Sequence, residues 1–182
     1  PPVLCVPFER NPCFTGRDKF LEKVRGTLFG DVDDDDGKEG KENITACAGV
    51  LTQGALKAAG GFGKTATAVQ YAWLAVERGL YPGGIITVRA DSTQDLTASL
   101  REVALNHLAV NADERKAWET DIDQDVDKTL ERAWGYVRRW LRETRELCLL
   151  FGDNVDDPSV LLDSVVGSGL TGMAGVHVLV TS

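Results

Sequence analysis

The sequence lacks the cysteine and histidine patterns that hold metal-bound or disulfide-linked domains together. Its four cysteines form no C-x-x-C pair, and its two histidines, His107 and His177, stand far apart. These spacings indicate neither a zinc site nor a disulfide framework. Free thiols in a chain that can bury a large core are typical of a reducing compartment, so we expect a cytoplasmic protein.

Long apolar runs and basic stripes are missing as well. No segment is apolar for long enough to span a bilayer and no signal peptide is recognisable, so we expect no membrane association. No cluster of basic and aromatic residues suggests a nucleic-acid surface. The net charge of −8 is mostly local, because residues 31–42 hold seven acids and two lysines, a net −5. This stretch lacks the ligand spacing of a calcium loop, and we interpret it as solvated.

Length and composition predict one domain. With 182 residues and 43% apolar content, the chain can bury a substantial core. We divide it into an N-terminal segment and helix (1–30), an acidic loop (31–42) and an α/β core (43–182). Apolar runs predict strands at 50–56, 85–88, 147–151 and 176–180. Helical spacing predicts helices ending near residue 29 and covering 64–78, 96–107, 126–141 and 159–166.

Alternating strands and helices are typical of three-layer proteins. The pattern predicts an α/β fold with a mostly parallel sheet flanked by helices and a ligand at the carboxyl edge of the strands. Ser92 to Asp95 resembles a capping box, and Gly79 ends the preceding helix. His107 falls on the apolar face of the 96–107 helix, and we expect it at the edge of the core. The polar stretch 111–123 gives no clear prediction.

The most informative stretch is glycine-rich and lies between a predicted strand and a predicted helix. It reads Ala58-Ala59-Gly60-Gly61-Phe62-Gly63-Lys64-Thr65. Such a loop directs backbone N–H groups at phosphate oxygens, at the positive end of the following helix. Lys64 would reach the β- and γ-phosphates, and Thr65 would bind Mg²⁺. The pattern is that of a P-loop, except that Ala58 replaces the first glycine.

A second candidate element follows the apolar run 147–151. Asp153 lies at the carboxyl end of that predicted strand. In a P-loop protein, an acid at this position holds Mg²⁺ through its water shell. The same residues, Asp153-Asn154 with Asp156-Asp157-Pro158, are also good turn formers. The P-loop upstream favours the magnesium interpretation.

Four blocks in order resemble the nucleotide-binding domain of NB-ARC proteins, which belong to the STAND class of P-loop signalling ATPases. Residues 14–18 with Leu21 resemble "F-V-G-R-E-x-x-L", and residues 60–65 resemble "G-G-[IVF]-G-K-T". Residues 149–157 resemble "L-L-V-L-D-N-V-D-D", and residues 178–182 resemble "[IV]-L-[IV]-T-[ST]-R", the sensor strand. The likeness covers most of the chain and implies a three-layer P-loop NTPase fold.

The resemblance implies an adenine-nucleotide site that binds ADP or ATP with Mg²⁺. Thr65 and Asp153 would hold the metal, and Lys64, Asp153 and Asp156 would be the candidate catalytic residues. Asn154 stands where many members carry a second acid, and it cannot accept a proton, so we expect slow hydrolysis at most unless Asp156 or Asp157 substitutes. The residues expected at the nucleotide are Phe14, Thr15, Gly16 and Arg17 around the base, and Gly60, Gly61, Phe62, Gly63, Lys64, Thr65 and Ala66 at the phosphates.

The implied function is a signalling switch. In such proteins ADP holds a closed state, and exchange for ATP permits self-association and signalling. The chain ends at Ser182, where the family's sensor arginine follows. The resemblance therefore implies a fragment of a longer protein whose partners include its own C-terminal ARC and repeat regions. Two alternatives stay open, a scaffold that keeps the fold without nucleotide and a P-loop kinase.

Overall fold

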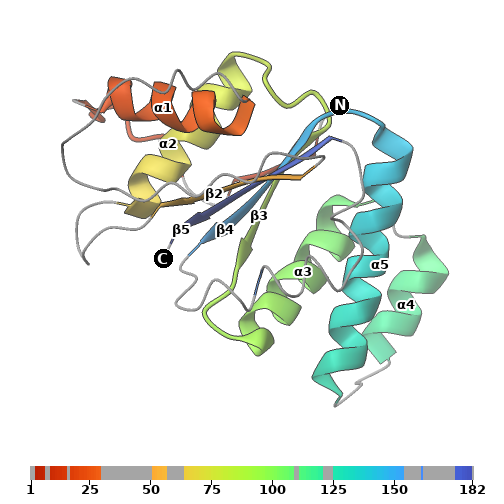
Figure 1. The fold of residues 1–182 in the computed structure, drawn as a ribbon. Helices are drawn as coiled ribbons and strands as arrows, with labels where there is room; N and C mark the ends of the chain where they lie inside the picture. Colours follow the sequence, from red (N-terminus) through yellow and green to blue (C-terminus); the bar gives the residue numbers. More distant parts are fainter. Residues whose placement is uncertain are drawn as a thin grey trace.

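The computed structural model describes residues 3–6, 9–15, 17–29, 51–56, 64–108, 111–120, 125–153, 161 and 175–181. Within these ranges the chain forms five strands and five helices (Figure 1). In chain order they are β1 (Val3–Cys5), α1 (Asp18–Phe29), β2 (Leu51–Leu56), α2 (Lys64–Glu77), β3 (Gly84–Arg89), α3 (Thr93–His107), α4 (Ala112–Thr120), α5 (Val126–Thr144), β4 (Cys148–Asp153) and β5 (Val176–Thr181).

The five strands form a single sheet in the order β1-β3-β4-β5-β2. All four neighbouring pairs are parallel. Every residue of β4 and β5 is buried, which explains why these strands are mostly apolar without alternation. The parallel sheet with helices confirms the predicted α/β class.

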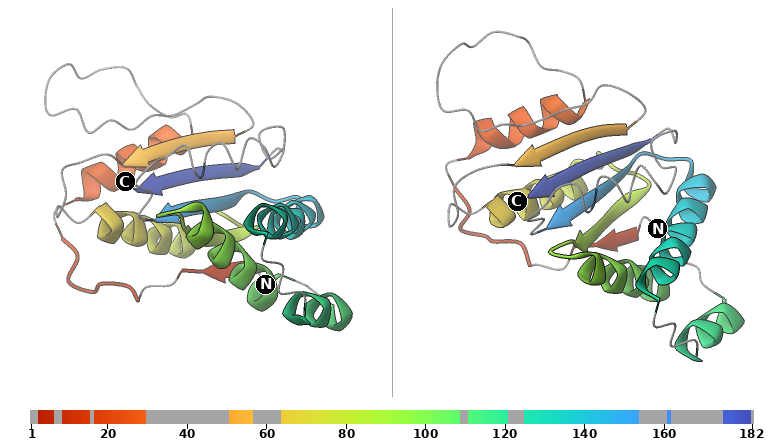
Figure 2. Two further views of the ribbon diagram at one scale, coloured as in Figure 1. Left: turned by 90° about the horizontal axis from the view of Figure 1, so that it is seen from below. Right: turned by 60° about the horizontal axis from the view of Figure 1, so that its bottom comes forward.

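Helices cover both faces of the sheet, as two further views show (Figure 2). Alternate side chains of one strand therefore enter two different apolar clusters. Leu149 and Phe151 of β4 pack with α1 and α2, whereas Cys148 and Leu150 pack with α3 and α5. The crossovers leave the carboxyl ends of all the strands at one edge of the sheet.

Local sequence signals fix several helix ends. The backbone N–H of Asp95 donates to Ser92 Oγ over 3.2 Å, which caps α3 as the sequence predicts. Gly79, with φ of 61°, follows α2 in the left-handed conformation that glycine adopts without strain. Helix α5 is longer than predicted and ends at Thr144, followed by its C-cap residue Arg145, which has φ of 54°.

The polar stretch 111–123, for which the sequence gave no clear prediction, contains α4. Its start is a reciprocal cap, in which the Glu114 N–H donates to Asn111 Oδ1 over 2.7 Å and the Asn111 N–H donates to Glu114 Oε2 over 3.2 Å. Its other anchor is the Trp118 ring, stacked on Tyr136 of α5 with 4.9 Å between centroids. The Arg139 guanidinium of α5 also pairs with Glu114 at 3.1 Å, so α4 is held by its cap and by aromatic and ionic contacts with α5.

The two histidines have opposite surroundings. His177 lies in β5, buried, where its Nδ1 is 3.1 Å from the Tyr81 hydroxyl and its ring meets Phe29 edge-on. Burial lowers the pKa of His177 to about 4. His107, in contrast, is exposed at the last residue of α3, so its predicted place at the core edge is wrong.

The predicted acidic loop and most of the predicted 159–166 helix lie outside the described residues.

Candidate functional site

The candidate site lies where β4, β5 and β2 end side by side. In the sheet register Leu56 of β2 is opposite Thr181 of β5, and Gly152 of β4 is opposite Val180. The last residues of β4 and β5 are Asp153 and Thr181. Polar side chains at these positions meet at the carboxyl edge, the usual ligand edge of parallel α/β sheets.

Asp153 is the centre of this group. Thr65 Oγ1, in the first turn of α2, donates to Asp153 Oδ1 over 2.9 Å. Thr181 Oγ1 donates to the same oxygen over 3.0 Å. Asp153 is only 6% exposed and Thr181 only 1%. Two hydroxyl donors therefore hold one oxygen of a nearly buried carboxylate, which fixes the orientation of that carboxylate.

The oxygen atoms of Thr65 and Asp153 suit a small hard cation. Magnesium keeps several waters and takes only one or two protein ligands. The Thr65 hydroxyl could be a direct ligand, and Asp153, whose Oδ1 accepts a 2.9 Å hydrogen bond from Thr65, could orient the water shell. The threonine also donates its proton to Asp153, which leaves the lone pairs of its oxygen available to a cation. Within the described ranges no group of three His, Cys, Asp or Glu side chains could hold a metal alone.

Arg17 of the N-terminal motif also contacts helix α2. Arg17 Nη1 donates to Thr67 Oγ1 over 2.8 Å, and Thr67 is 1% exposed. Phe14 packs against the apolar cluster that α1 and α2 share, while Thr15 is exposed. Arg17, one of the residues predicted around the base, is thus attached to the first turn of α2.

Part of the predicted site lies outside the described residues. The structure brings Thr65 and Asp153 together and puts Lys64 and Ala66 at the start of α2 by their backbones, with Ala66 exposed. The remaining predicted residues are not described, namely Gly16, Gly60, Gly61, Phe62, Gly63 and Asp156. Their roles stay predictions.

Comparison of the chain with protein-family models, with curated proteins and with solved structures found no match. The resemblance to NB-ARC proteins therefore depends on the four sequence blocks alone. Among the described helices none is both long and apolar enough to cross a membrane.

Two contacts at the site were missed by reasoning from the sequence. Thr181 ends the apolar run of β5 just as Asp153 follows that of β4, and this shared pattern was the available signal for their meeting. Thr67 gave no such signal, because a threonine inside a helix is more often structural. Its role as the acceptor for Arg17 depends on how α1 crosses α2.

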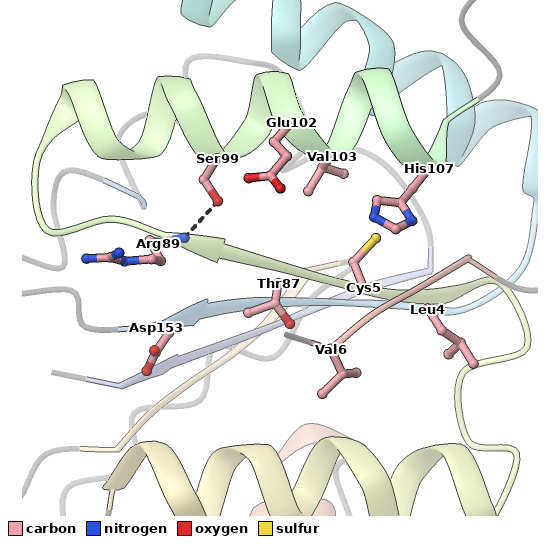
Figure 3. Close-up of a pocket in the computed structure, with 10 residues that line it drawn as sticks. All are labelled: Leu4, Cys5, Val6, Thr87, Arg89, Ser99, Glu102, Val103, His107 and Asp153. Carbon is pink, nitrogen blue, oxygen red and sulfur yellow. Dashed lines mark hydrogen bonds between the residues drawn. The ribbon is translucent and has the colours of Figure 1, made fainter. Parts of the chain in front are cut away.

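A cavity of about 510 Å³ adjoins Asp153 on the side of β3 and β1 (Figure 3). Ser99, Glu102 and His107 extend from α3 toward the sheet edge, and Cys5 Sγ points toward His107. Burial, reinforced by the Glu102 charge, raises the pKa of the Cys5 thiol to about 12. Cys5 is therefore a neutral thiol, and the Cys5, His107 and Glu102 group is unsuited to nucleophilic catalysis. The full lining is Leu4, Cys5, Val6, Thr87, Arg89, Ser99, Glu102, Val103, His107 and Asp153.

Proposed function

We propose that the chain is an adenine-nucleotide-binding module of the STAND type that binds ADP or ATP together with Mg²⁺. The observation that carries the proposal is the contact between Thr65 and Asp153, reinforced by Thr181. Thr65 and Asp153, 88 positions apart in the sequence, would supply the hydroxyl and the carboxylate of a magnesium site between the start of α2 and the end of β4. That helix directly follows the glycine-rich stretch 60–63.

The chemistry of phosphate binding supports the same location. The first turn of a helix offers backbone N–H groups that have no partner within the helix, together with the positive end of the helix dipole, and both attract phosphate. The first turn of α2 has no acidic residue, so no carboxylate competes there. Lys64 would neutralise phosphate charge, and Gly60, Gly61 and Gly63 would cradle the oxygens. Phe14 to Arg17 would border the base.

In this proposal Mg²⁺ arrives with the nucleotide. Magnesium usually relies on one or two protein ligands and completes its shell with phosphates and water. The metal would neutralise charge on the β- and γ-phosphates. Asp153, held by two hydroxyls, would orient the water shell on one side. Because Asn154 cannot accept a proton, turnover would be slow, and Asp156 is the candidate that could substitute as a base.

The biological role would be a switch. A γ-phosphate can shift a conformational equilibrium only if the two states bind it with different affinity. The C-terminal regions that the resemblance implies would supply the second state and permit self-association. The P-loop itself would bind the nucleotide phosphates.

Calorimetric titration with ADP and with ATP, each with and without Mg²⁺, tests the proposal. We expect one site per chain and tighter binding with Mg²⁺, because Thr65 and Asp153 would then contribute. An ADP preference supports the switch, whereas an ATP preference with turnover on an added small acceptor supports a kinase. A folded chain that binds neither nucleotide would contradict the proposal and favour the scaffold.

A further inference from the structure

The cavity beside Asp153 exists because β1 is short. Strand β1 ends at Cys5, opposite Ile86, whereas β3 continues to Arg89. Beyond Ile86 no described strand pairs with this edge of β3, and the Arg89 N–H donates instead to Ser99 Oγ of α3 over 3.1 Å. The cavity occupies this open edge. Its volume of about 510 Å³ falls within the range of small-molecule sites.

The charges that line the cavity are predominantly negative. Glu102 and Asp153 each contribute a carboxylate. The cation in the lining, Arg89, forms an ion pair with Asp91 at 3.2 Å, so its charge is already largely balanced. Asp153 accepts its two hydroxyl bonds through Oδ1. The cavity therefore offers hydrogen-bond acceptors to a ligand that brings donors and positive charge.

A buried polar group also faces this region without a partner. Thr87 is 6% exposed, and among the described residues its hydroxyl makes no hydrogen bond. An unpaired buried hydroxyl costs about 1–3 kcal/mol. In Figure 3, Thr87 and Asp153 lie on one side of the strands, and Glu102 extends from α3 on the other. A ligand that meets both carboxylates must therefore be extended and pass the open edge of β3.

We propose that this cavity binds a small extended organic dication, such as a diamine or polyamine. One ammonium group pairs with Glu102 and the other approaches Asp153 and Thr87. The neutral Cys5 thiol and the Val103 side chain line the path of the methylene chain between them. An anionic ligand would meet two carboxylates and is disfavoured. The diamine site shares Asp153 with the proposed magnesium site, but its binding requires no nucleotide.

The test is an NMR titration of the nucleotide-free chain with 1,4-diaminobutane, followed through backbone amide shifts. We expect saturable shifts at the amides of the cavity lining, above all those of Thr87, Ser99 and Glu102. 1,4-Butanediol has the same length without charge, and butylamine has one charge. Both are expected to give much smaller shifts. Equal shifts from either compound would overturn the proposal.

A matched pair of variants separates this site from general attraction to an acidic protein. Glu102→Gln removes one carboxylate at the cavity, and Glu131→Gln removes one from the exposed face of α5. We expect Glu102→Gln to weaken diamine binding about three- to five-fold and Glu131→Gln to leave it unchanged. Equal losses in the two variants, or shifts confined to residues 31–42, would overturn the proposal. Both residues are exposed, so both variants should fold.

Discussion

The hydrogen bond from Thr181 to Asp153 predicts a measurable coupling energy between two strands. Replacing Thr181 by Val keeps the shape of the side chain and removes the hydroxyl. A hydrogen bond to a charged group contributes about 1.5–3 kcal/mol to stability. Both residues are almost fully buried, so water cannot replace the lost donor. Because Thr65 still donates to the same oxygen, we expect the lower end of this range.

A double-mutant cycle measures this term directly. Thr181→Val, Asp153→Ala and the double variant would be compared by urea unfolding, and we expect a coupling energy of about 1.5 kcal/mol. Thr97→Val is the control for Thr181→Val, since Thr97 is also buried but donates to the Thr93 carbonyl within α3. Its cycle with Asp153→Ala should be additive. Additivity within about 0.5 kcal/mol for Thr181 as well would refute the assigned contact.

Three further predictions follow from other parts of the structure. A Cβ at Gly83 would lie 2.4 Å from Cys148 Sγ and 2.9 Å from the Glu146 carbonyl oxygen, whereas one at Gly135 in α5 meets nothing within 4 Å. Thermal unfolding should therefore show that Gly83→Ala destabilises by about 1–3 kcal/mol and Gly135→Ala stabilises by up to about 1 kcal/mol. The same sign for both would contradict this packing. His177 has its pKa lowered to about 4 by burial, so the unfolded chain takes up the proton first as pH falls. Its contribution, up to about 3 kcal/mol, is complete above pH 6.5 and is lost between pH 6.5 and 4. His177→Gln should flatten the stability profile in that window, and an unchanged profile would refute the assignment. Finally, if diamine and Mg²⁺ share Asp153, saturating 1,4-diaminobutane should weaken Mg²⁺-dependent ADP binding, and Mg²⁺-ADP should weaken diamine binding by the same factor. Independent binding would show that the amine does not reach Asp153.

The sequence predicted best those strands and helices whose formation is dominated by a single pattern in their own residues. The unbroken apolar run of β4 correctly predicted a strand buried on both faces, and the β-branched residues of β5 correctly predicted a strand. Ser92 predicted the start of α3, since a side-chain cap acts locally. The periodic apolar face of α5 predicted a long helix, because this periodicity is also a local property of the sequence. The parallel arrangement followed from the alternation of strands and helices.

The elements that escaped prediction depend on distant contacts. Strand β1 has only three residues, in a four-residue stretch between Pro2 and Pro7, and its extended state is fixed by pairing with β3. Helix α4 is polar and depends on its cap and on contacts with α5, among them Trp118 on Tyr136 and Glu114 with Arg139. At the site, the sequence motifs predicted Thr65 and Asp153 as the residues that hold Mg²⁺. The role of Thr181 required the sheet order, because β5 lies between β4 and β2.

The most direct test of the account compares ADP binding, in the presence of Mg²⁺, by the wild-type chain and by two lysine variants. Lys64→Ala removes the proposed phosphate ligand, and Lys128→Ala removes an exposed lysine paired with Asp125 in α5. Circular dichroism would establish that both variants are folded. We predict that ADP binds the wild type and Lys128→Ala alike and that binding to Lys64→Ala is abolished. Unchanged ADP affinity in folded Lys64→Ala would contradict the assignment of the glycine-rich stretch as a nucleotide site.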